Sequence, residues 1–302
     1  ELIDRRKQYD NITTKIKNGE ISNINDLITN NLDILQFVQD ALELSSDEKF
    51  IEYFYESLSK ISILDPTCGS GAFLFAAMNI LEPLYEACLR KIEEYSFKSK
   101  KEESSYSKRI LSDAYANENF NKQYFIFKTI ILKNIYGVDI MKEAVEISKL
   151  RLFLKLVSTI EPDTNKPNFG LDPLPDIDFN IRAGNTLVGF ATEDELGKGL
   201  RYTLDGLLAK PSIEAKCDLV SESFNNYKQV QLNSATNYEH IQETKKELKN
   251  RLIELNNELN KLLHKQASGI NYEKWLTTHR PFHWFAEFNE IIQDRGGFDV
   301  II

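Results

Sequence analysis

Two aspartates and a glycine-rich turn are the residues of this sequence whose types and positions suggest chemistry. Asp65 ends a short hydrophobic run and opens the turn DPTCGSG, and a helical apolar pattern starts directly after Gly71. Asp139 ends a second hydrophobic run, NIYGVDI. Glycines let backbone N–H groups approach a ligand closely, and a helix amino terminus favours negative charge. Because the Asp65 carboxylate would repel a phosphate, this turn suits a ligand that carries a cationic amine.

Each of these features has an alternative explanation. The glycine turn can be a plain strand-to-helix connection, and Asp139 can cap the helix that begins with MKEAV. Asp139 also lies much farther from the glycine turn than the roughly 20 residues of a dinucleotide-binding fingerprint. Asn185 follows a third apolar run, where its amide could bond to a purine edge or form a turn. The ends of three parallel strands would face one crevice, so the three candidates support one another.

Alternating strand and helix patterns must position these residues. Apolar runs at 61–64, 134–140 and 177–181, and the sequence GGFDVII, predict four strands separated by amphipathic helices. We therefore expect an α/β fold with a parallel sheet. The expected segments are a helical lead-in (1–60), a core (61–190) with a helical insertion (about 95–133) that bulges from the sheet, a second insertion (191–278) and a return to the core (279–302).

Two long helices in this scheme carry specific expectations. Pro83 should kink or interrupt the helix at 72–95. The residues expected on its inner face are Phe73, Ala76, Ala77, Ile80, Leu81 and Leu84. The segment 239–266 has apolar residues at spacings of three, four and seven, with six basic and five acidic residues. This pattern favours a packing or coiled-coil helix over a DNA contact.

Composition places the chain among soluble globular proteins, with 42% hydrophobic and 27% charged residues. The net charge of −9 disfavours a general nucleic-acid-binding surface, so DNA contact would need a local basic patch or a separate domain. Three widely spaced cysteines suggest no disulfide framework and indicate a reducing cytoplasm. We identify no transmembrane run and no signal sequence, and therefore expect a cytoplasmic protein without a membrane partner.

A structural explanation is preferred for two further candidate sites, a histidine pair and a cysteine. His279 and His283 are four residues apart, but Pro281 between them argues against a helical metal site, so we expect no metal ligands. Cys68 could be reactive beside a helix terminus, although a small packing residue is the preferred interpretation.

Several segments together resemble the S-adenosylmethionine-dependent adenine-N6 DNA methyltransferases, in particular the methylase modules of type IIG restriction–modification and phage-defence enzymes. The segment ILDPTCGSGAFLFAAMNILEPLYEAC resembles the first cofactor motif of this family. NIYGVDIMKEAVEISKLRLFL resembles the second motif, and FNIRAGNTLVGF resembles the third. HRPFHWFAEFNEII and GGFDVII resemble the segment that precedes the family's Asn-Pro-Pro-Tyr loop. The likeness spans roughly residues 31–302.

The resemblance implies a Rossmann-like class I methyltransferase core that binds S-adenosylmethionine. Asp65 and the turn would hold the methionine moiety, Asp139 would bond to the ribose hydroxyls, and Asn185 would meet the adenine edge. Phe73 would line the pocket, and Ile140 would lie against the adenine ring. The implied cofactor-binding residues are Asp65, Pro66, Thr67, Cys68, Gly69, Ser70, Gly71, Phe73, Asp139, Ile140 and Asn185.

The implied reaction is methyl transfer to the exocyclic amine of a flipped adenine. Double-stranded DNA would bind through domains outside this chain, and an endonuclease domain or subunit could accompany it. The sequence stops at Ile302, where the Asn-Pro-Pro-Tyr loop should begin, so we assign no catalytic residue and expect cofactor binding without methyl transfer. The alternatives are a methyltransferase acting on protein glutamine or an RNA base, and a non-catalytic assembly module that works through the 239–266 helix.

Overall fold

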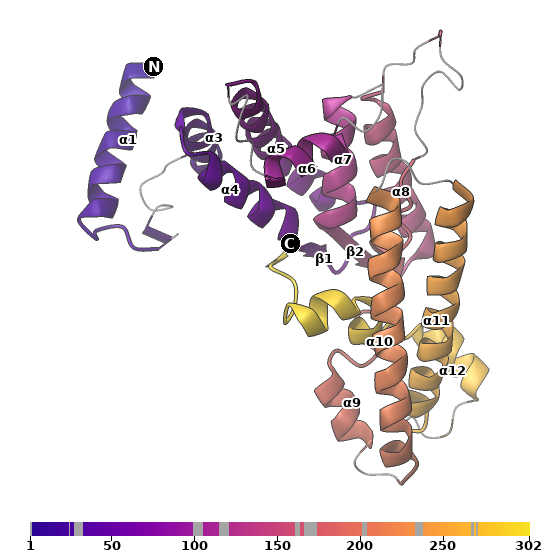
Figure 1. Cartoon of the computed structure of the whole chain (residues 1–302). Coiled ribbons are helices and arrows are strands. Elements are labelled where there is room, and N and C mark those ends of the chain that lie inside the picture. The colour runs from indigo at the N-terminus through magenta and orange to yellow at the C-terminus, as the bar shows by residue number, and fades with distance from the viewer. Residues whose placement is uncertain are drawn as a thin grey trace.

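The computed structural model contains a parallel sheet with helices on its faces (Figure 1). Within the described residues, four strands pair in the order β3-β2-β1-β4, and every neighbouring pair is parallel. The strands are β1 (Ile63–Asp65), β2 (Ile135–Asp139), β3 (Ile181–Ala183) and β4 (Val300–Ile301). The structure describes residues 2–23, 25–26, 33–98, 105–114, 121–160, 164–165, 174–200, 204–232, 238–266, 269 and 271–302. The predicted α/β fold is confirmed.

Helices account for most of the remaining described chain. In chain order they are α1 (Leu2–Lys17), α3 (Ile34–Leu44), α4 (Glu48–Lys60), α5 (Ala72–Lys98), α6 (Ser105–Ala114), α7 (Lys122–Lys133), α8 (Lys142–Val157), α9 (Glu193–Leu200), α10 (Leu204–Leu232), α11 (Tyr238–His264), α12 (Tyr272–His279), α13 (Trp284–Glu287) and the π-helical turn η2 (Glu290–Asp294). Asp or Asn side chains accept backbone N–H bonds at the starts of α3, α4, α7 and α12. These caps satisfy orphan N–H groups and fix where the helices begin.

The third strand begins later than the sequence suggested. Ile177 and Phe179 are buried, and with Ile181 they give the alternation expected of a strand. The chain instead turns here, because the Asn180 and Ile181 N–H groups donate to the Ile177 carbonyl. The buried Asn180 amide also donates to the Ile135 carbonyl at the start of β2, 3.1 Å away. The prediction of a strand at 177–181 was therefore wrong, because the strand spans Ile181–Ala183.

Helix α5 also departs from its prediction. It runs through Pro83 to Lys98 without interruption, and Phe73 and Ile80 are 66% and 53% exposed. The buried face carries Ala77 and Leu81, as expected, together with Leu74 and Met78. The first half of α5 is apolar on nearly every side, so its sequence does not define one face. Ala72–Ser96 is also long and apolar enough to cross a membrane, contrary to our expectation, but α5 packs against α3, α4, α7 and the sheet.

Helix α7 belongs to the main hydrophobic core. Ile126, Phe127 and Ile130 are almost completely buried in the cluster that contains the inner residues of α5 and α8. The expectation that this whole region bulges from the sheet was wrong for α7. The other predicted domain boundaries stay predictions.

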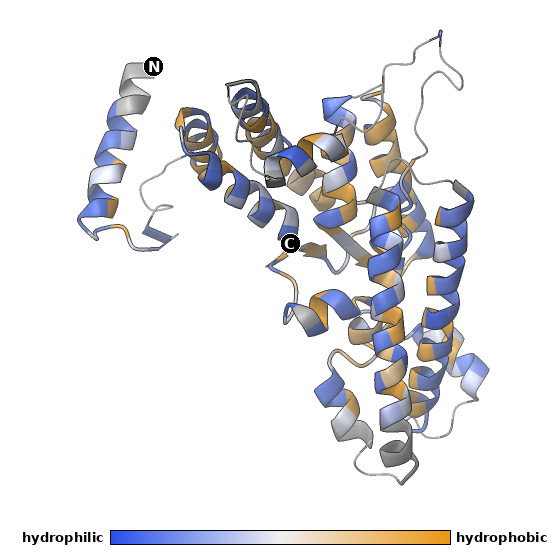
Figure 2. Cartoon of the chain, in the orientation of Figure 1, coloured by the Kyte–Doolittle hydropathy of each residue, from blue (hydrophilic) through white to orange (hydrophobic). Residues whose placement is uncertain are grey.

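Helices α10 and α11 lie side by side and form a second core (Figure 1). Hydrophobic and hydrophilic residues alternate along both helices, as Figure 2 shows. Leu248, Leu252, Leu255 and Leu259 of α11 are at most 5% exposed. The packing prediction for this helix is confirmed. An assembly module working through this leucine stripe is disfavoured, because α10 already covers it.

The edge strand β4 is held to the start of β1 by a polar contact. The N–H and hydroxyl of Ser62 both donate to the Asp299 carboxylate, each over 2.8 Å, across 237 residues of sequence. These hydrogen bonds, first of all the one from the Ser62 N–H, lower the pKa of Asp299. The contact sets the register in which Ile63 lies opposite Val300.

Candidate cofactor-binding site

The carboxyl ends of β1, β2 and β3 lie next to one another, as a shared crevice requires. In the sheet register Asp65 is opposite Gly137, and Asp139 is opposite Ala183. The Gly69 N–H donates to Asp139 Oδ2 over 2.9 Å. The glycine turn and the second aspartate, 70 residues apart, are therefore in direct contact.

The glycine turn is fixed from two sides. The Cys68 N–H donates to the Val138 carbonyl over 2.9 Å, which extends the pairing of β1 with β2. Gly71 has φ +82°, and a Cβ there would lie 2.4 Å from Ser148 Oγ of α8. Arg151 of α8 donates to the Ser70 carbonyl and hydroxyl over 2.9 and 3.0 Å. The part that α8 takes in shaping this turn was not predicted from the sequence.

Asp65 is a buried carboxylate with an unused oxygen. The residue is 2% exposed, and Oδ1 accepts the Thr67 N–H over 3.1 Å. Oδ2 is buried and has no hydrogen-bond partner among the described residues. Burial, reinforced by the charge of Asp139, raises the pKa of Asp65 despite that hydrogen bond. A buried carboxylate of this kind is stabilised by a cation or a strong hydrogen-bond donor.

Both carboxylate oxygens of Asp139 have structural contacts. Its Oδ1 accepts the Met141 N–H over 2.8 Å, so it shapes the entry to α8. Its Oδ2 accepts the Gly69 N–H, so it also holds the glycine turn. Each carboxylate oxygen has two lone pairs, and both oxygens can therefore accept a further hydroxyl.

Asn185 begins a turn beyond β3. Its side-chain oxygen accepts the Leu187 N–H over 3.1 Å, which confirms the turn-forming interpretation. The group that remains to meet a purine acceptor is its Nδ2 amine. The Asn185 N–H donates to the Arg280 carbonyl over 2.8 Å, and Asn185 pairs with Pro281 in a parallel bridge.

Residues 280–284, here called the closing segment, complete this edge of the site. The Phe282 N–H donates to the Val188 carbonyl over 2.7 Å, and Trp284 Nε1 donates to the Thr186 carbonyl over 3.1 Å. Gly184 is required here, since a Cβ would lie 2.6 Å from the Phe282 ring. No site residue was predicted in this segment, because no local pattern marks its partners almost 100 residues away.

Exposed apolar side chains follow the strand ends in the sequence. Phe73 follows the glycine turn, and Ile140 follows β2 with 46% of its surface exposed. Leu187, in the loop after Asn185, is 93% exposed and was not anticipated. Exposed apolar groups around a polar crevice suit a ligand with an aromatic ring.

Cys68 and the two histidines have structural contacts. Burial, with the nearby carboxylates of Asp65 and Asp139, raises the pKa of Cys68 to about 12, so the thiol stays protonated and unreactive. His283 Nδ1 accepts the Phe190 N–H over 3.1 Å, and burial lowers the pKa of His283 to about 4. Its Nε2 therefore carries the proton and donates to Asn260 Oδ1 of α11, 3.0 Å away. His279 Nδ1 lies 3.0 Å from the Trp275 carbonyl.

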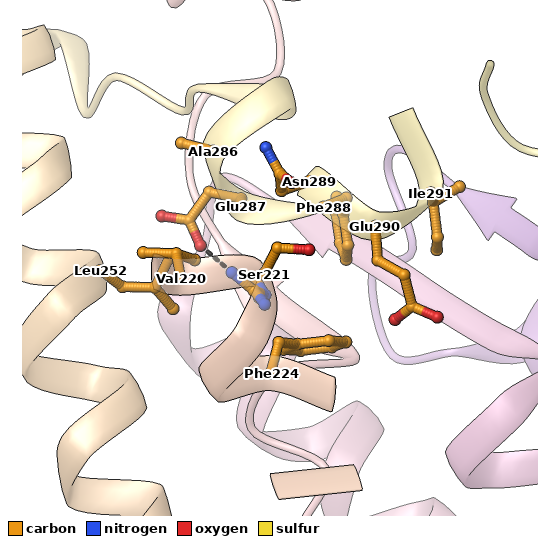
Figure 3. A pocket seen from close by; sticks show the side chains of 11 residues that line it. Val220, Ser221, Phe224, Leu252, Ala286, Glu287, Phe288, Asn289, Glu290 and Ile291 are labelled. Carbon is orange, nitrogen blue, oxygen red and sulfur yellow. Dashed lines mark hydrogen bonds and ion pairs between the residues drawn. The ribbon is translucent and has the colours of Figure 1, made fainter. Parts of the chain in front are cut away.

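A small cavity lies between β3, α10, α11 and the segment from Ala286 to Ile291 (Figure 3). Its volume is about 10 Å³, which is at the lower limit for one water molecule. Val220, Leu252 and Phe288 contribute apolar side chains to its wall (Figure 3). This cavity is too small for a cofactor.

The fold and the carboxylate-lined strand ends define an α/β methyltransferase core, and comparisons with known proteins agree. The chain belongs to the Eco57I restriction-modification methylase family, whose model matches residues 133–302. The MmeI DNA-methyltransferase domain model matches residues 41–186. Together these matches include the glycine turn, Asp139 and Asn185.

A curated relative gives the same result. A putative type II restriction enzyme and methyltransferase of Methanocaldococcus jannaschii is 27% identical to this chain. The alignment is 328 residues long and covers 95% of this chain. The chain matches 25% of that relative's length. No solved structure matches the chain.

Proposed function

We propose that this chain binds S-adenosylmethionine and forms the cofactor half of an adenine-N6 DNA methyltransferase of restriction–modification or phage defence. The observation that carries the proposal is the buried Asp65 carboxylate, whose unused Oδ2 lies beside a glycine turn held by Asp139. The family membership supports this use of the crevice. When bound, the cofactor supplies an electrophilic methyl group.

The residues present fit the cofactor's chemistry. The unused oxygen of Asp65 suits the methionine ammonium, and the oxygens of Asp139 suit the two ribose hydroxyls. The exposed side chains of Phe73 and Ile140 suit the apolar faces of the adenine ring. The Nδ2 amine of Asn185 can donate to a purine nitrogen. The remaining residues that we propose for the site, Pro66, Thr67, Cys68, Gly69, Ser70 and Gly71, shape the turn around Asp65.

The methyl acceptor that we propose is the exocyclic amine of adenine in double-stranded DNA, bound through domains outside residues 1–302. A base inside a duplex must be flipped out to be reached, at a cost of a few kcal/mol. Any label transferred to DNA from methyl-tritiated cofactor should therefore be recovered in N6-methyladenine. Label in cytosine, RNA or protein glutamine would support an alternative substrate.

Replacing Asp139 by Asn should weaken S-adenosylmethionine binding at least about tenfold, because hydrogen bonds to a charged acceptor contribute roughly 1.5–3 kcal/mol each. Isothermal titration calorimetry of the purified chain measures this effect. Glu143→Gln is the matched control, since it removes an exposed carboxylate from the first turn of α8. Saturating ligand at about 100 times Kd should also stabilise the unchanged chain by roughly 2.7 kcal/mol. Absence of binding by the unchanged, folded chain would refute the proposed function.

The raised pKa of Asp65 predicts a pH-dependent affinity. A ligand ammonium favours the carboxylate, so a protonated Asp65 must lose its proton when the ligand binds. Affinity should therefore fall as pH decreases through the raised pKa, approaching about tenfold per pH unit below it. The stability of the free protein depends on pH in the opposite direction. The contribution of Asp65 to the free energy of unfolding increases as pH falls from the raised pKa toward 3.8.

Calorimetric titrations of the unchanged chain and of Asp65→Asn at several pH values test this linkage. The variant should bind more weakly at neutral pH and should lack the acid-side decrease. An unchanged slope in Asp65→Asn would assign the titration to another group.

A further inference from the structure

We propose that Arg280 is a positioning residue of the cofactor crevice, which holds the two walls that would enclose the adenosine moiety at a fixed separation. This inference rests on the proposed function, and it assigns a role to a residue outside the three motifs. The two walls are the residues after β2, represented by Ile140, and the turn after β3, represented by Asn185.

Arg280 bonds to both walls at once. Its Nη1 donates to the Ile140 carbonyl over 2.9 Å, across 140 residues of sequence. Its own carbonyl accepts the Asn185 N–H over 2.8 Å. The two walls are also joined at the ends of β2 and β3, where the Gly184 N–H donates to the Asp139 carbonyl over 2.9 Å. Arg280 therefore adds a second connection nearer the ligand side of the strand ends.

The backbone of Arg280 is unfavourable for an arginine. Among the described residues it is the one non-glycine residue with positive φ, at φ 46° and ψ 56°. It ends α12 in the left-handed conformation, where its N–H donates to the Leu276 carbonyl over 3.0 Å, and glycine is usual at such helix ends. A residue held in a disfavoured backbone conformation suggests that its contacts matter. Here the observed contact is the bond to Ile140.

The rest of the closing segment anchors Arg280. Phe282 and Trp284 bond to the carbonyls of Val188 and Thr186 in the loop that begins with Asn185. His283 is fixed between Phe190 and Asn260 of α11. The arginine carbonyl is thus positioned by the backbone, whereas its guanidinium alone reaches across to Ile140. Backbone and side-chain contributions can therefore be separated by substitution.

Arg280→Gly is the informative substitution, because glycine keeps the carbonyl bond to Asn185 and relieves the backbone strain. We expect an unchanged or raised thermal midpoint together with S-adenosylmethionine binding that is weakened about tenfold, as for loss of one charge-assisted hydrogen bond. Arg280→Lys should recover part of the affinity, since an ammonium retains a donor for the Ile140 carbonyl. Improved stability with impaired binding is not expected of a merely structural residue.

A second ligand identifies the wall concerned. 5′-Methylthioadenosine contains the adenosine part of the cofactor without its ammonium and carboxylate. In calorimetric titrations, Arg280→Gly should weaken the binding of both ligands by similar factors. Asp65→Asn is the matched control, because it should weaken S-adenosylmethionine binding and leave methylthioadenosine binding unchanged.

Three results would overturn this role for Arg280. The first is equal affinity of the unchanged chain and Arg280→Gly for both ligands. The second is weaker binding of S-adenosylmethionine alone. The third is weaker binding of both ligands together with a lowered thermal midpoint. If the unchanged chain bound neither ligand, the proposed function would fail together with this inference. Normal binding by the unchanged chain and by Arg280→Gly would refute the inference alone.

Discussion

Gly189→Ala should lower the free energy of unfolding by roughly 3 kcal/mol or more, as the sum of overpacking and left-handed backbone strain. Gly189 has φ +156°, and a Cβ there would lie 2.0 Å from the Phe282 carbonyl oxygen. The obstructing atoms belong to the backbone of the closing segment, so no rotamer change can make room. The loop that carries Asn185 must then separate from the closing segment, and cofactor affinity should fall as well.

Urea unfolding and calorimetry on the same preparation measure both effects of Gly189→Ala. Gly197→Ala is the control, because Gly197 lies in α9 with no atom within 4 Å of an added Cβ. That change should stabilise the chain by roughly 0.5–1 kcal/mol, as alanine does in helix interiors. If Gly189→Ala unfolded at the same urea concentration as the unchanged chain, the tight contact with Phe282 would be disproved.

Glu287→Ala should cost about 3–5 kcal/mol of stability, because it leaves Arg182 buried without its counter-ion. Arg182 of β3 is 7% exposed and is ion-paired with Glu287. Its Nε donates to the Phe179 carbonyl over 2.7 Å, whereas Nη2 has no partner among the described residues. Burial lowers the pKa of Arg182, although the charge of Glu287 opposes the shift. Glu287 also accepts a hydrogen bond from the side-chain amide of Asn256 of α11 over 2.6 Å, so it links the sheet to the second core.

Two comparisons make this second prediction specific. The double variant Arg182→Met with Glu287→Leu should be close to the unchanged chain in stability, because it removes both buried charges together. Glu56→Gln breaks the exposed pair of Glu56 with Lys60 and should cost about 0.5 kcal/mol or less. Chemical denaturation of all variants gives the ranking. A cost for Glu287→Ala as small as that for Glu56→Gln would mean that water reaches Arg182.

The strands and turns near the proposed cofactor were predictable because their signals are local. A hydrophobic run, an aspartate and a glycine turn specify β1 and the entry to α5, and the same logic located Asp139. The start of β3 was missed because the alternating apolar residues 177–181 fill the core around a turn held by Asn180. A buried polar contact of that kind has no periodic signature.

The closing segment was beyond sequence reasoning for a different physical reason. The hydrogen bonds of Arg280 and Phe282 reach backbone groups about 90 to 140 residues away. No residue type is needed to accept a hydrogen bond on a carbonyl, so the partner leaves no mark in its own sequence. Only the glycines at 184 and 189 signal close approach, and the sequence does not say to what.

The bond between Ser62 and Asp299 has a consequence for how the chain is made. Ribosomes add roughly 5–20 residues per second, so β1 is synthesised on the order of 10 to 50 seconds before its neighbour β4. Helices α10 and α11, which are consecutive in sequence, can pair during that interval. One edge of β1 is therefore unpaired on the nascent chain during this time. An unpaired strand edge can form hydrogen bonds with other polypeptides. A pulse of protease during translation should find the β1 region cleavable until residue 299 has left the exit tunnel.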